Sequence, residues 1–121
     1  MSVHFEETKF GSVTVNGERY KDVLVIDGEV IPRDLDMLHE NYGTGHVIAP
    51  EEVDRLVRGD IDYLIVGTGQ SGVLKVTEDL KEATRAAATK LRTAKTPEAI
   101  KKFNELVKKG KEVNALIHVT C

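Results

Sequence analysis

The segment of this chain that most strongly suggests a ligand-binding site is a glycine-rich hexapeptide with the spacing G-x-G-x-x-G. Its residues are Gly67, Thr68, Gly69, Gln70, Ser71 and Gly72. In dinucleotide-binding folds this spacing follows a strand and opens a helix, whose N-terminal amides hold the pyrophosphate. Residues 62–66 have the apolar run of such a strand, but residues 73–76, Val-Leu-Lys-Val, alternate like a second strand. No acidic residue closes another strand about 20 residues later. We therefore predict a turn between two strands and no dinucleotide.

The same turn could bind a small anion. Successive backbone amides in a turn can form an anion-binding nest, and Thr68, Gln70 and Ser71 add polar donors. Arg33 and His46, with Asp34, lie in segments that could converge on the turn, and these residue types serve in acid–base chemistry and anion clamps. The alternative is that the glycines serve only the backbone conformation and that Arg33 and His46 are structural. The candidate ligand-binding residues are Arg33, His46 and the hexapeptide.

The C-terminal histidine and cysteine suggest no metal site. His118 and Cys121 are three residues apart, so on a strand they would point to opposite faces. The other histidines, His4, His39 and His46, have no spacing typical of zinc ligands. Cys121 could be a nucleophile only with a base beside it and a lowered pKa. We expect no metal, no cofactor and no catalytic residue, and the role of Cys121 stays open.

Composition favours a single cytoplasmic domain over residues 1–121. The chain has no apolar run of the roughly 20 residues that cross a membrane, no signal-peptide pattern, and one cysteine, which cannot form an internal disulfide. Residues 1–78 carry 7 basic and 15 acidic side chains, whereas residues 79–121 carry 10 basic and 5 acidic ones. The lysines near the C-terminus lack the aromatic neighbours that nucleic-acid binding uses. We expect no nucleic acid and no membrane as partners.

The elements that must position these groups are strands first and alternating helices and strands afterwards. Alternation predicts strands at residues 3–6, 12–16, 19–26 and 29–33, an antiparallel meander. Residues 34–45 read as a surface loop or a weak helical turn. Pro50 starts a short helix, Thr77 caps a long one over residues 78–91, and Thr96-Pro97-Glu98 starts the last, with strands at 92–95 and 113–119. This order predicts an α/β fold with a mixed β-sheet covered by helices.

An ordered set of short segments resembles a known family. The segments are Asp22-Val-Leu-Val, Asp27-Gly-Glu-Val, Gly45-His46, Pro50-Glu-Glu, Tyr63-Leu-Ile-Val with the hexapeptide, Thr96-Pro-Glu-Ala99 and Leu116-Ile-His-Val-Thr-Cys121. Together they span nearly the whole chain and resemble the adipogenesis-associated Mth-domain family, small α/β proteins of unknown function whose relatives include a mitochondrial complex I assembly factor. Archaeal members look most similar. The resemblance implies a three-layer fold with a central mixed sheet and no established reaction, although residues 92–95 are more polar than the family's strand there.

Two functions from different classes follow as hypotheses. The first is a non-catalytic domain that acts through protein–protein contacts of an assembly or regulatory type, including a homodimer. It rests on the lack of a complete catalytic set and on the assembly-type relatives that the resemblance implies. The second is a small-molecule or anion-binding protein, or an enzyme, that uses residues 67–72 with Arg33 and His46.

Overall fold

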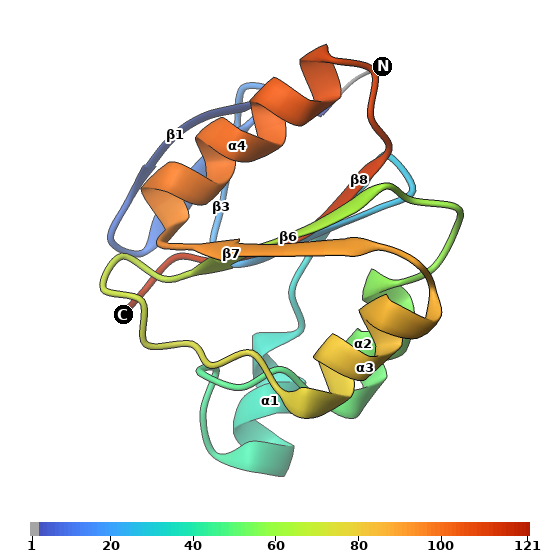
Figure 1. The fold of residues 1–121 in the computed structure, drawn as a ribbon. Helices are drawn as coiled ribbons and strands as arrows, with labels where there is room; N and C mark the ends of the chain where they lie inside the picture. The colour runs from blue at the N-terminus through green and yellow to red at the C-terminus, as the bar shows by residue number, and fades with distance from the viewer. Residues whose placement is uncertain (1–2) are drawn as a thin grey trace.

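A central five-stranded sheet organises the computed structural model, which describes residues 3–121 (Figure 1). Its strands are β4 (Val23–Ile26), β5 (Glu29–Pro32), β6 (Tyr63–Thr68), β7 (Lys90–Ala94) and β8 (Val113–His118). Their order in space is β5-β4-β8-β6-β7. β6 runs parallel to β7 and β8, whereas β4 runs antiparallel to β5 and β8. The sheet is therefore mixed, as the sequence predicts.

Layers on both faces of this sheet complete the fold. A small antiparallel sheet, made of β1 (Phe5–Lys9), β2 (Ser12–Val15) and β3 (Glu18–Tyr20), lies with helix α4 (Thr96–Lys108) on one face. The helices α1 (Leu35–Tyr42), α2 (Pro50–Leu56) and α3 (Glu78–Ala86) lie on the other face (Figure 1). The predicted three-layer α/β class is confirmed.

The last strand of the chain lies at the centre of the sheet. All six residues of β8 are buried, because the strand has neighbours on both edges and side chains packed on both faces. On the α4 face, Phe5 and Phe103 meet edge to face with ring centroids 4.9 Å apart, which joins the small sheet to the helix. On the other face, Leu56 and Leu80 bring α2 and α3 onto the sheet. No helix within residues 3–121 is long and apolar enough to cross a bilayer.

The predicted strand over residues 19–26 is wrong. It is two strands, β3 and β4, which belong to different sheets. The chain passes from one sheet to the other at Lys21 and Asp22, and Asp22 is buried there by an arginine and a histidine rather than exposed as part of a regular strand. This crossing places a carboxylate inside the molecule.

The predicted strand over residues 73–76 is also wrong. These residues have no regular secondary structure; Leu74 is buried in the core on the side of α2 and α3, whereas Val73 is 48% exposed. The next helix begins only at Glu78. The glycine-rich turn therefore does not open a helix, which a dinucleotide site of the Rossmann type requires.

Three other element boundaries differ from the sequence prediction. Residues 34–45, for which the sequence allowed a surface loop or a weak helical turn, contain the eight-residue helix α1. Thr77 caps α3 as predicted, but α3 ends at Ala86 because Ala88 adopts a left-handed φ of 55°. Thr96 does not cap α4, since Lys95 holds the cap position and the Thr96 hydroxyl bonds to the backbone of His118 and Gly69.

Candidate functional site

A buried cluster of charged side chains lies where β4, β8 and α2 meet, and Arg33 is at its centre. Its Nε donates to Glu52 at 2.7 Å, and its Nη1 donates to the Asp22 carboxylate at 3.0 Å and to the Gly45 carbonyl at 2.9 Å. Its Nη2 donates to Glu52 at 2.9 Å and to the Val47 carbonyl. These five contacts use all five donors of a guanidinium. Arg33 thus fastens the segment around His46 to the sheet, and it has no donor left for a ligand.

Asp22 is the second member of the cluster. Its carboxylate accepts hydrogen bonds from Arg33, from His118 Nδ1 at 2.7 Å and from the Val119 amide at 2.8 Å. Burial alone would raise the pKa of Asp22, but hydrogen bonds from His118, Val119 and Arg33, with the charge of His118, outweigh it. The pKa of Asp22 therefore lies below its ordinary value, and the side chain is an anion at neutral pH.

The lowered pKa of Asp22 predicts how stability depends on pH. A carboxyl group with a lower pKa in the folded than in the unfolded state contributes stability above its ordinary value of 3.8. This contribution is lost as the pH falls through the folded-state pKa. We expect Asp22→Asn to destabilise the protein at neutral pH and the deficit to shrink as the pH drops below about 4. Urea unfolding across this pH range measures the difference in unfolding free energy between the variant and the parent protein. The control is Asp60→Asn, because Asp60 is exposed. A difference that does not change with pH would contradict the prediction.

His118 continues a chain of hydrogen bonds from Asp22 toward the surface. Because Asp22 is ionised and can only accept, His118 Nδ1 carries the proton of their bond. On the other side of the ring, Nε2 lies 3.1 Å from the Thr120 hydroxyl, which donates to it when the imidazole is neutral. A carboxylate, an imidazole and a hydroxyl in series can hold one tautomer and move a proton at Nε2.

His46 packs against this imidazole. The two rings meet edge to face, with centroids 4.8 Å apart and an angle of 72°. The Nδ1 atom of His46 is buried and has no hydrogen-bond partner within the described part of the chain. An unpaired buried polar atom costs about 1–3 kcal/mol, and such an atom in a folded protein calls for an explanation. A bound ligand that forms a hydrogen bond with this atom is one such explanation.

A cavity of about 420 Å³ opens beside the two histidines. Its size falls in the range of small-molecule sites, roughly 300–1,000 Å³. Its walls combine apolar groups, bases and the C-terminal residues, and they include Phe10, Lys21, Leu35, His39, His46, His118, Thr120 and Cys121. Asp22 also borders it, but the Asp22 carboxylate already accepts hydrogen bonds from Arg33, His118 and Val119. The side chains left to meet a ligand are therefore basic, polar or apolar.

The glycine-rich turn lies behind the C-terminal residues rather than beside the cavity. Its amides point at the chain's own backbone: Gln70 N donates to Thr120 O at 2.7 Å, and Ser71 N and Val73 N donate to Cys121 O at 3.1 and 2.9 Å. Gly69 N donates to the Thr96 hydroxyl at 3.0 Å. The turn thus makes a nest of amides, and residues 120 and 121 fill it.

The remaining polar groups of the turn are also used within the chain. Thr68 donates its hydroxyl to Ala94 O at 3.0 Å, and the Gln70 side-chain amide donates to the Thr8 hydroxyl and the Lys9 carbonyl at the end of β1. Gly67 packs beside Thr96 and Ile117, and Gly72 has a left-handed φ of 77°. Through these contacts the turn holds the C-terminal residues in place, so that Thr120 and Cys121 line the cavity.

The structure brings together only part of the predicted site. Arg33 is linked to the His46 segment through the Gly45 and Val47 carbonyls, but residues 67–72 are separated from both by the C-terminal residues that they bind. Asp34 does not join the site, because it caps α1 by accepting from Met37 N. Asp22 and Thr120 were missed, and His118 was considered only together with Cys121 and set aside. The one available signal was the period of two between His118 and Thr120, which places them on the same face of an extended segment.

No set of three His, Cys, Asp or Glu side chains within residues 3–121 is grouped so that it could hold a metal ion. The imidazoles of His46 and His118 therefore do not belong to such a set. Imidazoles can form hydrogen bonds and exchange protons.

Comparison with known proteins shows which family this chain matches. Residues 5–118 match a family described as Protein of unknown function (DUF498/DUF598). The chain is similar to the conserved hypothetical protein PH1505 from Pyrococcus horikoshii OT3, at 33% identity over 97% of this chain and 98% of that one, with a TM-score of 0.82. It is also similar to the protein MT938, at 37% identity over 99% of this chain and 100% of that one, with a TM-score of 0.76.

A more distant relative shares the fold. A protein from Bordetella pertussis, described as a Mth938-like domain, is 17% identical over 96% of this chain and 85% of that one, with a TM-score of 0.62. The resemblance to the Mth-domain family that the sequence segments indicate is thereby confirmed.

Proposed function

Because this chain belongs to the family of proteins of unknown function DUF498/DUF598, we propose its function from its own geometry: it binds a small organic anion in the cavity beside His46 and His118. The carrying observation is that His46 lines this cavity and that its buried Nδ1 atom has no hydrogen-bond partner among the described residues. Lys21, His39 and His46 line the cavity and can donate hydrogen bonds to a carboxylate or phosphate group. Phe10 and Leu35 favour an apolar part in the same ligand.

Arg33 and Asp22 act as positioning residues in this proposal. Arg33 holds the Gly45 and Val47 carbonyls on either side of His46, and Asp22 holds the ring of His118. The turn of residues 67–72 holds Thr120 and Cys121 at the cavity wall. The ligand therefore contacts imidazoles and Lys21, whereas the glycine-rich turn shapes the wall.

A thermal-shift screen tests the binding of an anion. The probes are inorganic phosphate, benzoate, citrate and nucleoside monophosphates, each against sodium chloride of equal ionic strength. Ligand at about 100 times its dissociation constant stabilises the native state by about 2.7 kcal/mol, which for a domain of this size raises Tm by several degrees. We expect a saturable rise with at least one organic anion that His46→Gln abolishes.

The matched control is His4→Gln, because His4 is exposed and lies outside the cavity lining. This variant should keep the full rise in Tm. An equal rise in the His46→Gln variant would show that the anion acts elsewhere. A screen in which no anion raises Tm would overturn the proposal.

Protein–protein contact, including self-association, is the second candidate function. Two exposed apolar side chains favour it: Phe10 is 66% exposed and Val73 is 48% exposed. Both lie near Cys121, since Phe10 lines the same cavity and the Val73 amide bonds to the Cys121 backbone. A partner seated over these side chains would cover the cavity mouth in a cytoplasmic assembly. Light scattering over a range of protein concentrations decides whether that partner is a second copy.

A further inference from the structure

The strand β7 leaves one edge of the central sheet open. It pairs with β6 and with no other strand of the described chain. Lys90 N donates to Asp62 O, so the backbone of Lys90 and of every second residue after it faces β6. The backbone groups of Leu91 and Thr93 consequently face away from the sheet. An open edge of this kind can accept a strand from another molecule.

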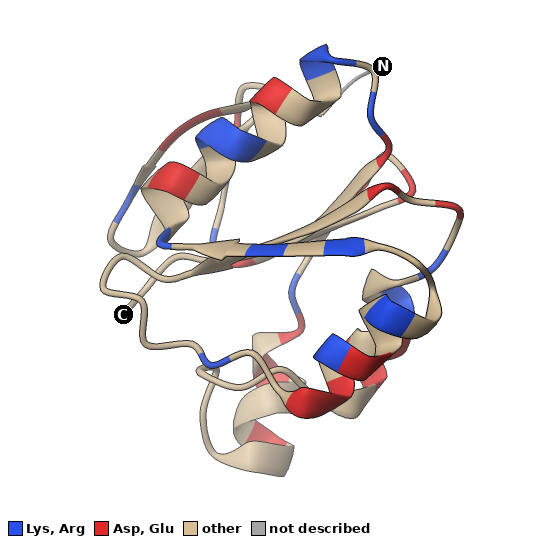
Figure 2. Ribbon diagram, in the orientation of Figure 1, with Lys and Arg blue, Asp and Glu red and all other residues tan. Residues whose placement is uncertain are grey.

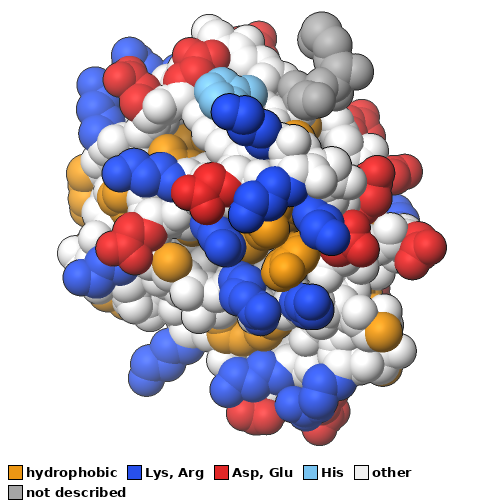
Figure 3. All heavy atoms as spheres, turned by 45° about the horizontal axis from the view of Figure 1, so that its top comes forward, with side chains coloured by type: hydrophobic (Ala, Val, Ile, Leu, Met, Phe, Trp, Pro, Cys, Tyr) orange, Lys and Arg blue, Asp and Glu red, His pale blue; other side chains and the backbone are white. Residues whose placement is uncertain are grey.

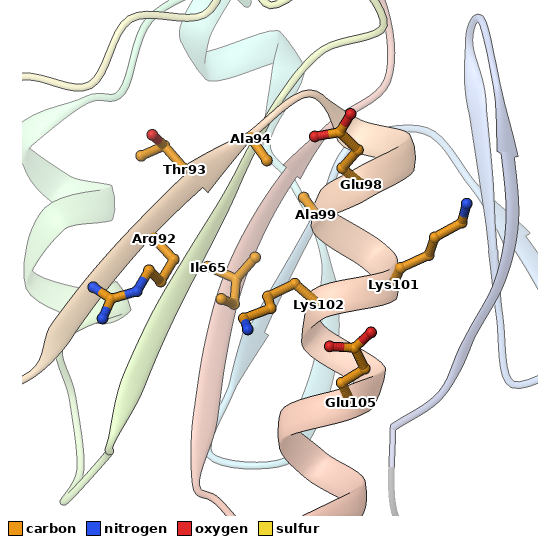
Figure 4. Close-up of a pocket in the computed structure, with 9 residues that line it drawn as sticks. All are labelled: Ile65, Arg92, Thr93, Ala94, Glu98, Ala99, Lys101, Lys102 and Glu105. Atoms are coloured by element: carbon orange, nitrogen blue, oxygen red, sulfur yellow. The ribbon is translucent and has the colours of Figure 1, made fainter.

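A hollow lies beside this edge, between β7 and α4. It has a volume of about 410 Å³, and its floor is formed by Ile65, Ala94 and Ala99. The two alanines leave space that larger side chains would fill (Figure 4). Figure 3 shows this face of the molecule, where basic side chains surround hydrophobic atoms at the surface. The hollow therefore has an apolar floor, in which Ile65 and Ala99 are buried and Ala94 is partly exposed.

The rim of the hollow carries bases from both walls. Arg92 projects from β7, and Lys102 points from α4 across the hollow toward Ile65 (Figure 4). Register places Lys90, Arg92 and Ala94 opposite Tyr63, Ile65 and Gly67, so their side chains lie on the α4 face. Lys90 Nζ and Arg92 Cζ lie 5.5 and 5.6 Å from the centroid of the Tyr63 ring. β7 is thus lined with positive charge (Figure 2).

These bases are not balanced by ion pairs. Within residues 3–121 neither Arg92 nor Lys102 forms a salt bridge, although Glu98 and Glu105 also border the hollow. Charged residues on an edge strand commonly prevent pairing with another copy of the same protein. Here two copies of β7 would bring Lys90 and Arg92 of each chain together, which is unfavourable. The same charges attract a strand of opposite charge.

We propose that β7 and the hollow bind an extended acidic segment of another protein, which adds to the sheet as a sixth strand. Its backbone pairs with the open groups of Thr93 and with the Leu91 amide. To pair with the Leu91 carbonyl it displaces Arg92 Nη1, which donates to that carbonyl at 3.0 Å in the free protein. Every second side chain of this segment lies on the α4 face. An apolar side chain on that face can therefore enter the hollow over Ala94 and Ala99, while carboxylates two residues away on the same face contact Arg92 and Lys102. This surface is separate from the histidine cavity, and the proposal does not depend on ligand binding there.

The probe is an acetylated and amidated heptapeptide with the sequence glutamate–threonine–valine–threonine–glutamate–threonine–valine, which places glutamate and valine on the same face of a strand, titrated into ¹⁵N-labelled protein. We expect a dissociation constant of about 100 μM, with the largest NMR changes and slower hydrogen exchange at the Leu91 and Thr93 amides. The charge reversal Arg92→Glu with Lys102→Glu should weaken binding at least about tenfold. The matched reversal Lys108→Glu with Lys111→Glu, outside the hollow, should change it less than about twofold. Of two peptides N-methylated at odd or at even residues, the one whose methylated amides face β7 should not bind.

Several results would overturn this proposal. If the two charge reversals weaken peptide binding equally, the peptide is attracted only by the net charge of the protein and not by this surface. Unchanged affinity of both N-methylated peptides would exclude strand addition. Tighter binding of a single-stranded DNA dodecamer at β7 would assign the surface to nucleic acid, and a mass that doubles with concentration in the parent protein but not in the Arg92→Glu, Lys102→Glu variant would assign it to a second copy. No change at β7 with millimolar concentrations of the acidic heptapeptide would also refute it.

Discussion

Replacing Arg33 by methionine is expected to lower the free energy of unfolding by about 4 kcal/mol, because removal of one partner from a buried ion pair leaves the other charges uncompensated. Here two carboxylates lose their partner at once. Asp22 and Glu52 have side chains that are 2% and 5% exposed, so water cannot replace the guanidinium. The carbonyls of Gly45 and Val47 lose their donor as well. Urea unfolding followed by circular dichroism measures the change.

The exposed pair Lys81–Glu78 provides the matched control. Its atoms lie 3.3 Å apart, and its side chains are 46% and 76% exposed. Lys81→Met should therefore cost less than about 0.5 kcal/mol. If Arg33→Met does not fold, Arg33→Lys keeps the charge but loses the planar fork, and we expect it to fold with a smaller deficit.

A second variant identifies the cause of the loss. Glu52→Gln removes one of the stranded charges, while its side-chain oxygen can still accept from the Ala49 amide. The double variant Arg33→Met, Glu52→Gln should therefore be more stable than the sum of the single changes predicts, by about 1 kcal/mol or more. Strict additivity, or a cost of Arg33→Met near that of Lys81→Met, would contradict the role given to the buried charges.

The sequence predicts the elements whose local signals are strong. Thr77 bonds to the Leu80 amide as a helix cap should, and Pro97 lies in the first turn of α4. Asn16-Gly17 turns between β2 and β3, with a positive φ at both residues as a tight hairpin requires. These signals act over a few residues, which is why the sequence alone carries them.

Elements decided by distant contacts could not be predicted in this way. Alternation shows that residues 19–26 are extended, but not that Tyr20 and Val23 belong to different sheets. Leu74 resembles a strand residue by pattern, yet it packs on the helical face with no strand beside it. Periodicity specifies which side chains are buried together, whereas the choice of neighbours depends on tertiary packing.

The candidate site was recognised only in part for the same reason. His46 and Arg33 stood out by type, since imidazole and guanidinium groups in loops often bind ligands. Asp22 and His118 are 96 positions apart, and their contact exists only because β8 inserts beside β4. The glycine spacing was a true signal for a nest of amides, but spacing cannot show that the nest binds the chain's own residues.

The most direct test of that nest is Gly69→Ala. An added Cβ at this position would lie 2.3 Å from the backbone carbon of Cys121 and 2.8 Å from the Thr120 oxygen, and Gly69 has a φ of 104°. Contacts this short with backbone atoms require the C-terminal residues to move. The hydrogen bonds from Gln70, Ser71 and Val73 to these residues would then be lost. We expect a decrease in the unfolding free energy of about 3–4 kcal/mol.

Gly110→Ala separates the effect of backbone conformation from that of the close contact. Gly110 also has a positive φ, of 81°, but no atom lies within 4 Å of an added Cβ. Its substitution should cost only about 1 kcal/mol, the conformational penalty alone. The difference between the two variants, about 2 kcal/mol or more, therefore measures the close contact with the C-terminal residues.

Hydrogen exchange gives a local readout of the same change. In the Gly69→Ala variant the Ser71 and Val73 amides should lose protection before the strands β6 and β8 do, because their acceptor is the displaced Cys121 backbone. The Gly110→Ala variant should leave both amides protected. If the two alanine variants are equally stable and Ser71 and Val73 stay protected in both, the C-terminal residues are not held by the turn, and the nest would be free for an external anion.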